Sequence, residues 1–304
     1  MEQSNPTLII DQVTKKFGEF TAVRNLSLQV WPGRVFGLIG PNGAGKTTTI
    51  RMIVNITIPD SGRIELFGKA MTTALQDRIG YLPEERGLYR KMKIGEQLRF
   101  FAELKNLRVK DADHRIDVWL EKMQLSQWKD KRAKDLSKGM QQKVQFIMAV
   151  IHDPDLLILD EPFSGLDPVN VEVMKQTILE KKAEGKTIIL STHQMEIAEK
   201  LCDDVCMINK AEKVLDGRLR DIKRSFARNA VALQLEGDDG ALNDSELVAS
   251  VRQNGDDTEV LLAPGGNPQT LLKQLIASGA VVNKFERVEP SLHDIFIEKV
   301  RETS

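Results

Sequence analysis

The backbone and side chains of residues 40–48 are suited to holding phosphate. This run is Gly40-Pro41-Asn42-Gly43-Ala44-Gly45-Lys46-Thr47-Thr48. It fits the pattern G-x-x-x-x-G-K-S/T and lies between an apolar stretch that predicts a strand and a stretch that predicts a helix. Its glycines allow backbone N–H groups to turn towards oxyanions, and the helix adds the positive end of its dipole. We therefore expect Lys46 to reach the β- and γ-phosphates of a nucleotide and Thr47 to bind Mg²⁺.

Two adjacent carboxylates follow an apolar run farther along the chain. Residues 156–159 are all leucine or isoleucine, which predicts a strand buried on both faces of a parallel sheet, with Asp160 at its carboxyl end. Ligands bind at this edge of open α/β sheets, so we expect Asp160 to complete the Mg²⁺ shell with Thr47, directly or through water. Glu161 is then placed to polarise the water that attacks the γ-phosphate. The alternative is that Glu161 only caps the next turn.

Three other segments offer side chains to the same chemistry. His193 ends a second predicted buried strand and is a candidate contact for a γ-phosphate. Ser137 predicts the N-cap of a helix, and backbone N–H groups near Gly139 form a second potential anion site. An aromatic ring on the loop ahead of the phosphate loop would stack on a nucleobase, and we choose Phe17 over Phe20. A phenylalanine that faces the core is the alternative there.

The bulk composition is that of an ordinary globular protein. Lysine and arginine total 43 against 44 aspartate and glutamate residues, so the net charge of -1 gives no general reason to expect nucleic acid as a partner. No apolar run approaches the length of a membrane span, so we expect a cytosolic protein whose membrane role comes through a partner. The two cysteines, Cys202 and Cys206, are too few for a disulfide framework and lack a second ligand pair for a metal site.

The order of predicted elements divides the 304 residues into two parts. Strands and helices alternate over residues 1–220, which we predict to be a nucleotide-binding domain. A helical insert interrupts this order at about 90–135. A charged run at 221–228 indicates a boundary, and the remaining elements predict a small α+β accessory domain at 221–304.

In this order the motifs closely resemble those of ATP-binding subunits of ABC transporters, in the group with an appended C-terminal domain that pairs with ABC-2 type export permeases. The resemblance is strong from residue 7 to about residue 220 and weaker over the C-terminal segment, where residues 289–296 carry it. It implies an α/β P-loop NTPase fold of ABC type, with a mixed sheet core, a helical insert and a small C-terminal α+β domain. It also implies ATP and Mg²⁺ as cofactors and ATP hydrolysis as the reaction, with Glu161 as the catalytic carboxylate and His193 as the switch histidine.

The signature loop of this family matches residues 136–140 incompletely. Lys138 and Met140 stand where family members usually have glycine and glutamine. Ser137 and Gly139, which the family uses on the γ-phosphate, are retained. We therefore include all four residues from 137 to 140 in the candidate ATP site.

Three more positions are assigned by the resemblance. Phe17 matches the base-stacking aromatic, and Asp167 ends the turn at 164–167 that bridges subunits in the family. Glu84 stands where the family commonly has glutamine, and a carboxylate there could still bind Mg²⁺ or a water molecule. We therefore add Glu84 to Thr47 and Asp160 as a candidate metal ligand.

The resemblance also implies partners. In this family the signature loop of one subunit completes the site of another, so we expect a head-to-tail dimer of two copies that encloses two ATP molecules. We further expect an integral membrane permease as partner, a peripheral location at the cytoplasmic face of the cell membrane through that permease, and no nucleic acid. Two other hypotheses stay open. One is a soluble ATPase of the same fold that acts on ribosomes or DNA, and the other is a weakly hydrolysing regulatory scaffold.

Overall fold

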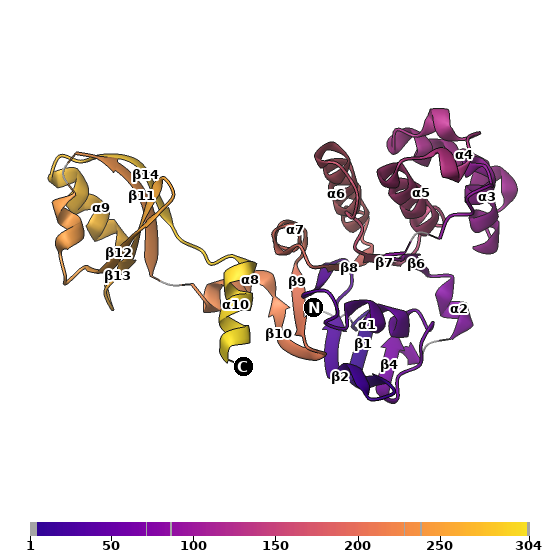
Figure 1. The fold of residues 1–304 in the computed structure, drawn as a ribbon, viewed down its shortest axis with the longest axis horizontal. Helices are drawn as coiled ribbons and strands as arrows, with labels where there is room; N and C mark the ends of the chain where they lie inside the picture. Colours follow the sequence, from indigo (N-terminus) through magenta and orange to yellow (C-terminus); the bar gives the residue numbers. More distant parts are fainter. Residues whose placement is uncertain (1–4, 71, 86, 228, 238, 303–304) are drawn as a thin grey trace. The chain divides into compact units, whose positions relative to one another are not determined.

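The computed structural model describes residues 5–70, 72–85, 87–227, 229–237 and 239–302. The chain forms two compact units (Figure 1). The first runs to Leu219 and takes in the chain from Lys299 onwards, and the second is Arg220–Glu298. The chain passes between the units within helices α8 (Leu219–Ser225) and α10 (Leu292–Glu302). The break at Leu219 lies beside the predicted boundary, and the role of each part as a separate domain remains our proposal.

Two sheets and their helices build the first unit. An antiparallel sheet has the strand order β2-β1-β4-β5. Its strands are β1 (Leu8–Phe17), β2 (Phe20–Val30), β4 (Ser61–Leu66) and β5 (Lys69–Ala70). The second sheet has the order β10-β9-β3-β8-β7-β6 and is parallel except for the β9–β10 hairpin. Its strands are β3 (Val35–Ile39), β6 (Ile79–Leu82), β7 (Leu156–Asp160), β8 (Thr187–Thr192), β9 (Asp204–Asn209) and β10 (Glu212–Arg218).

The helices of the first unit connect and cover these strands. They are α1 (Lys46–Ile53), α2 (Thr73–Gln76), α3 (Ile94–Leu104), α4 (Val109–Lys122), α5 (Lys138–Val150), α6 (Pro168–Ala183) and α7 (Met195–Leu201), with 3₁₀ turns at Ser126–Trp128 and Ala133–Asp135. In the part of the chain that the structure describes, no helix is both long and apolar enough to pass through a lipid bilayer.

Apolar strands and α1 form the main core. Every residue of β3, β7 and β8 is buried, as expected for strands with neighbours on both sides. Leu8 of β1, Ile50 of α1 and Ile158 of β7 pack in one cluster, which joins the two sheets. Full burial of each such side chain contributes about 1.5–3 kcal/mol to folding. Cys202 and Cys206 are free and buried, and burial raises the pKa of both thiols, so they act as small core residues.

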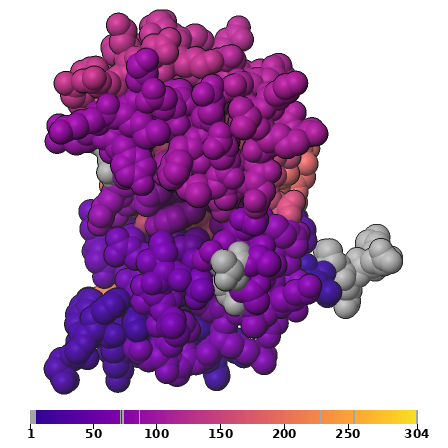
Figure 2. All heavy atoms as spheres, turned by 90° about the vertical axis from the view of Figure 1, so that its right-hand side faces the viewer, coloured from indigo at the N-terminus to yellow at the C-terminus, as the bar shows by residue number. Residues whose placement is uncertain are grey.

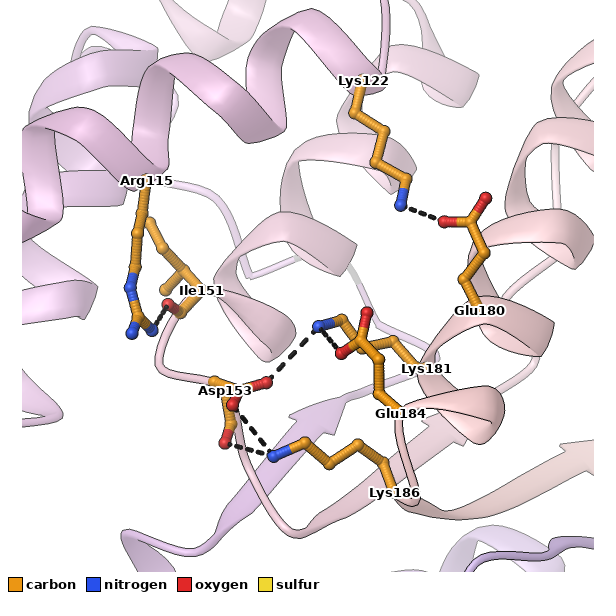
Figure 3. A network of polar contacts seen from close by, with 8 residues as sticks. All are labelled: Arg115, Lys122, Ile151, Asp153, Glu180, Lys181, Glu184 and Lys186. Atoms are coloured by element: carbon orange, nitrogen blue, oxygen red, sulfur yellow. Dashed lines mark hydrogen bonds and ion pairs between the residues drawn. The ribbon is translucent and has the colours of Figure 1, made fainter.

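The helical insert packs on α5 and makes polar contacts with the end of α5 and with α6. Trp119 of α4 meets Phe146 of α5 edge to face, with ring centroids 6.2 Å apart. Polar contacts hold the middle and the carboxyl end of α4, where Arg115 donates to the carbonyl of Ile151 at 2.9 Å and Lys122 pairs with Glu180 of α6 (Figure 3). Figure 2 shows the purple to magenta atoms of the insert above the indigo atoms of the N-terminal residues. The insert is therefore anchored beside the loop that leads into β7.

Helix α5 lies unusually close to the edge strand β6. A Cβ atom at Gly80 would sit 2.0 Å from the carbonyl oxygen of Ala149, so only glycine allows this approach. The close contact fixes α5 relative to the parallel sheet. It matters for the site, because α5 begins at the predicted signature loop.

The second unit is a small α+β structure. Its antiparallel sheet has the order β12-β13-β11-β14. The elements are β11 (Ala230–Glu236), a 3₁₀ turn (Gly240–Asn243), β12 (Val248–Asn254), β13 (Asp257–Leu262), α9 (Pro268–Ala277) and β14 (Val281–Arg287). Leu271 and Leu275 of α9 pack on Val231 and Val260 of the sheet, which gives this unit its own core.

One buried histidine predicts a pH dependence of folding. His152 follows α5 and its Nε2 lies 3.1 Å from the carbonyl oxygen of Ile79. Burial, followed by the charge of Lys105, lowers the pKa of His152 to about 4, although Asp77 and Asp153 oppose the shift. The unfolded state therefore binds more protons between the ordinary value of 6.5 and about 4. Stability from this residue is complete above that window and is lost as the pH falls through it.

We expect the variant His152→Gln to lose less stability on acidification than the wild type. Between about pH 7.5 and about pH 5.5 the difference should be roughly 1 kcal/mol, allowing for partial exposure of the ring. Urea unfolding at the two pH values measures it. Equal losses in the wild type and the variant would show that His152 is not the titrating group.

Candidate active site

The phosphate loop is shaped by close contact with β9. It leaves the carboxyl end of β3 and ends at Gly45, the residue before α1. Gly40 has a φ angle of 153°, and a Cβ atom there would lie 2.0 Å from the carbonyl oxygen of Ile208. Only glycine fits this position, so the loop cannot accept a larger residue without moving β9. Pro41, Asn42 and Gly43 are exposed, which leaves the outer part of the loop open to a ligand.

Lys46 lies inside the loop that it follows. Its side chain is nearly buried, and its ammonium group donates to the carbonyl oxygens of Gly40 at 2.9 Å and Pro41 at 3.1 Å. The same nitrogen is 3.8 Å from Oε1 of Glu161. Burial lowers the pKa of Lys46, and the charges of Glu161, Asp160 and Glu84 oppose this shift. The lysine is thus held among carbonyl and carboxylate oxygens at the edge of the sheet.

Asp160 provides two buried oxygens for a cation. It ends β7 with no exposed surface, and neither carboxylate oxygen has a hydrogen-bond partner. Burial raises the pKa of Asp160; the nearby hydroxyls of Ser191 and Thr47 oppose the rise, but neither makes a hydrogen bond of ordinary geometry to it. Unpartnered buried carboxylate oxygens are suited to coordinating a cation, and hard oxygen donors fit Mg²⁺.

This donor set fits a magnesium–nucleotide complex better than a free metal ion. Among the described residues, no three His, Cys, Asp or Glu side chains come together as a metal-binding cluster. Mg²⁺ in nucleotide enzymes is held by one or two carboxylates, while phosphates and water supply the other ligands. The Thr47 hydroxyl lies 3.4 Å from Oε2 of Glu84, so two of the three predicted metal ligands are neighbours.

Glu161 is fixed by the end of the neighbouring strand β8. Its carboxylate Oε1 accepts a hydrogen bond from the backbone N–H of His193 at 3.0 Å and lies 2.8 Å from Nδ1 of the same residue. Oε2 accepts a hydrogen bond from the Thr192 hydroxyl at 3.3 Å. The carboxylate therefore makes its contacts across the sheet and not with the turn that follows, which favours the catalytic interpretation over a capping role.

A cleft of about 340 Å³ brings together part of the candidate set, whereas Asp160, His193, Phe17, Asp167 and residues 137–140 are outside its lining. It is lined by Phe20, Ala22, Asn42, Gly43, Gly45, Lys46, Thr47, Thr48, Glu84 and Glu161. A larger hollow of about 1210 Å³ lies at the amino ends of β3 and β9, where Arg34 is paired with Asp204, and it holds none of the predicted site residues. We place the chemistry in the smaller cleft, because the phosphate loop and Glu161 face it.

The two aromatic candidates lie on strands, which corrects the predicted loop. Phe17 ends β1 and Phe20 begins β2, and the two residues pair across a short turn with Gly18 in the left-handed region at φ 58°. The antiparallel hairpin extends farther than the apolar pattern suggested. Both rings are exposed, 53% for Phe17 and 63% for Phe20, but Phe20 lines the cleft and Phe17 does not. The choice of Phe17 for base stacking stays a prediction.

The predicted signature loop forms the start of α5. Ser137 is the N-cap of this helix, as predicted, and its hydroxyl accepts a hydrogen bond from the backbone N–H of Met140 at 3.2 Å. Lys138 is exposed, and Gly139 is packed so closely that a Cβ atom would lie 3.1 Å from the carbonyl oxygen of Gly165. Within the described chain, the lining of the cleft includes no residue from 137 to 140. One chain therefore does not bring this loop to its own phosphate loop.

Asp167 caps α6 beside this loop. Its carboxylate accepts hydrogen bonds from the backbone N–H of Asn170 at 3.0 Å and from the Asn170 side chain at 2.5 Å. These bonds lower the pKa of Asp167, with the backbone contact as the larger cause. The carboxylate thus stays ionised at the exposed end of the turn at 164–167.

Two residues that contact Glu161 were not predicted from the sequence. Thr192 bonds to Glu161, and its signal was its place just before His193 at the end of a buried strand. Gln142 of α5 donates to the carbonyl oxygens of Pro162 at 3.2 Å and Glu161 at 3.5 Å. No local pattern marks Gln142, because its partners lie about twenty residues away.

Two protein-family models match this chain, one in each of its two parts. The family model described as ABC transporter matches residues 23–164, and that of the C-terminal domain of DrrA1-3-like ATP-binding proteins matches residues 217–300. The ABC transporter ATP-binding protein YhaQ of Bacillus subtilis is 44% identical over 293 residues, which cover 96% of this chain and 98% of that protein.

A second relative and a solved structure are similar over most of this chain. The Nod factor export ATP-binding protein I of Burkholderia lata is 33% identical over 288 residues, which cover 94% of both proteins. A solved structure of an ATP-binding subunit of an ABC transporter has a TM-score of 0.68 at 31% identity, covering 72% of this chain and 93% of that one. The chain accordingly belongs to the ATP-binding proteins of ABC transporters.

Proposed function

We propose that this ATP-binding subunit hydrolyses ATP and drives export through a separate membrane permease. The observation that carries the proposal is a single cleft lined by Lys46, Thr47 and Glu161, beside the unpartnered oxygens of Asp160. The export names of relatives such as the Nod factor export protein support the direction of transport. The subunit then acts at the cytoplasmic face of the membrane, to which the permease binds it.

In this proposal, nucleotide binding replaces hydrogen bonds within the phosphate loop by hydrogen bonds to phosphate. The ammonium group of Lys46 leaves the carbonyl oxygens of Gly40 and Pro41 and bonds instead to phosphate oxygens. Backbone N–H groups of the loop and the start of α1 hold the remaining phosphate charge. Thr47 and Asp160, with Glu84 as a third candidate, would hold Mg²⁺, which neutralises charge on the β- and γ-phosphates when bound.

Hydrolysis needs a base on the side of the γ-phosphate opposite to the leaving oxygen of ADP. Glu161 accepts a proton from a water molecule while the water oxygen bonds to the γ-phosphorus, and the bond to the leaving oxygen of ADP breaks. His193 and Thr192 hold both carboxylate oxygens, so contacts within the chain orient the base. His193 is also our candidate for direct contact with the γ-phosphate.

A second copy completes the site in this proposal. The loop at 137–140 does not line the cleft of its own chain, yet Ser137 and Lys138 are exposed at a helix start that suits phosphate. A head-to-tail pair would bring Ser137 and Gly139 of one chain to the ATP bound by the other. ATP favours this pair only to the extent that it makes more contacts in the closed form than in the open one.

The permease has a suitable docking place on the helical insert. A groove of about 260 Å³ opens between β6, α3 and α5, lined mainly by apolar side chains such as Tyr81, Phe101 and Met148. The rings of Tyr89 and Phe100 lie beside Phe101 and are exposed. An exposed aromatic cluster next to an apolar groove is typical of a protein interface, and we assign it to a cytoplasmic helix of the permease.

The variant Glu161→Gln should bind ATP but hydrolyse it at least about a hundredfold more slowly, because the amide cannot accept the proton. It should also accumulate as an ATP-bound dimer. Steady-state phosphate release and light scattering after size exclusion measure the two effects. Glu103→Gln, an exposed change on α3, is the control and should hydrolyse ATP normally. Wild-type turnover in Glu161→Gln would refute the assigned mechanism.

A charge placed in the aromatic cluster should uncouple the chain from the membrane. We expect Phe100→Glu to leave the ATPase rate of the isolated chain unchanged and to reduce its retention on salt-washed membranes of its own host at least about tenfold. Ile58→Glu is the matched control, because Ile58 is also an exposed apolar residue but lies away from the groove. Equal retention of both variants would remove the docking assignment.

A further inference from the structure

Two adjacent polar side chains of α5 are buried against residues 161–170, which begin with the catalytic Glu161 and are called the catalytic segment below. Gln142 is 1% exposed and Lys143 is 4% exposed, although buried positions of a helix usually carry apolar residues. Burial of a polar group costs free energy unless its hydrogen bonds are replaced. Both side chains make such bonds, and both reach residues between 161 and 170.

Gln142 holds the backbone that carries the catalytic carboxylate. Glu161 has a φ angle of 48°, in the left-handed region that strains the backbone of a non-glycine residue. Its N–H donates to the carbonyl of Ser191 at 3.0 Å, and its own carbonyl accepts from Ser164 at 3.1 Å. The side chain of Gln142 adds bonds to this carbonyl and to the next one, that of Pro162. The strained residue is therefore fixed from the side of α5.

Lys143 orients the cap of α6. Its ammonium group donates to Oδ1 of Asn170 at 2.9 Å, which turns the amide nitrogen of Asn170 towards Asp167. Burial lowers the pKa of Lys143, whereas the charge of Asp167 opposes this shift. Two consecutive residues of α5 thus contact both ends of the segment 161–170.

We infer that Gln142 and Lys143 are positioning residues for ATP hydrolysis. They couple the start of α5 to Glu161 and Asp167, so that the loop at 137–140 and the catalytic carboxylate move as one body. The packing of Gly139 against the carbonyl of Gly165 supports this coupling at the first turn of the helix. The inference rests on the proposed function, because it concerns the same reaction.

The test compares two equally buried glutamines. Gln97 is also fully buried and donates to two carbonyl oxygens, those of Tyr89 at 3.1 Å and Met92 at 3.2 Å, but it lies in the helical insert. Gln142→Ala and Gln97→Ala should lower the midpoint of thermal unfolding by similar amounts, because each removes a buried amide that donates to two carbonyl oxygens. We expect Gln142→Ala to lower kcat at least about tenfold with KM for ATP within about twofold, and Gln97→Ala to keep the wild-type kcat.

The outcomes separate this inference from the proposed function. If the wild type shows no Mg²⁺-dependent ATPase activity, the proposed function fails. If the wild type and Gln97→Ala hydrolyse ATP and Gln142→Ala does so at the same kcat, the positioning role is wrong.

A second pair of variants covers the case in which Gln142→Ala does not fold. Lys143→Met keeps the apolar stem and removes the donor, so its kcat should fall with KM unchanged, and Lys143→Arg should recover most of the rate. A wild-type kcat in Lys143→Met would overturn the inference.

Discussion

Buried charge at the carboxyl edge of the parallel sheet is the constraint on which the rest of the structure depends. Lys46, Asp160 and Glu161 are all at least nine-tenths buried, and they lie at the ends of adjacent elements. The Glu161 carboxylate accepts hydrogen bonds from Thr192 and His193 at the end of β8, but both carboxylate oxygens of Asp160 lack partners. A buried polar group without a partner costs about 1–3 kcal/mol, more when it is charged. The fold tolerates this cost because fully buried strands and α1 hold the edge in place.

Helix α5 connects this edge to the surface assigned to the permease. Gln142 reaches the catalytic segment, while Gln145, one turn later, donates to the carbonyl of Glu85 at 3.2 Å, next to the candidate ligand Glu84. Gly80 allows the same helix to approach β6. One helix therefore contacts both the backbone at Glu161 and the loop at Glu85, so movement of the groove would reach the backbone that carries the catalytic carboxylate.

The sequence predicted the parts of the site that depend on local pattern. The phosphate loop and the buried strand before Asp160 follow from a glycine–lysine spacing and from an uninterrupted apolar run, and neither needs knowledge of distant residues. The prediction of a loop around Phe17 was wrong, because bulges in the two strands there break the period-two pattern by which a strand is recognised. Gln142 was missed because its role depends on which helix packs beside Glu161. Contacts between residues that are distant in sequence cannot be predicted from a short stretch of sequence.

Thermal unfolding of the wild type and Asp160→Asn tests the central claim, that Asp160 is kept unpartnered for a magnesium-bound nucleotide. The account predicts that Asp160→Asn, without ligand, unfolds at the same temperature as the wild type or a higher one. At ATP about a hundred times above its dissociation constant, the wild type should gain about 2.7 kcal/mol, with part of the gain dependent on Mg²⁺. In the variant the Mg²⁺-dependent part should vanish. A less stable variant that still gains from Mg²⁺ would contradict the account.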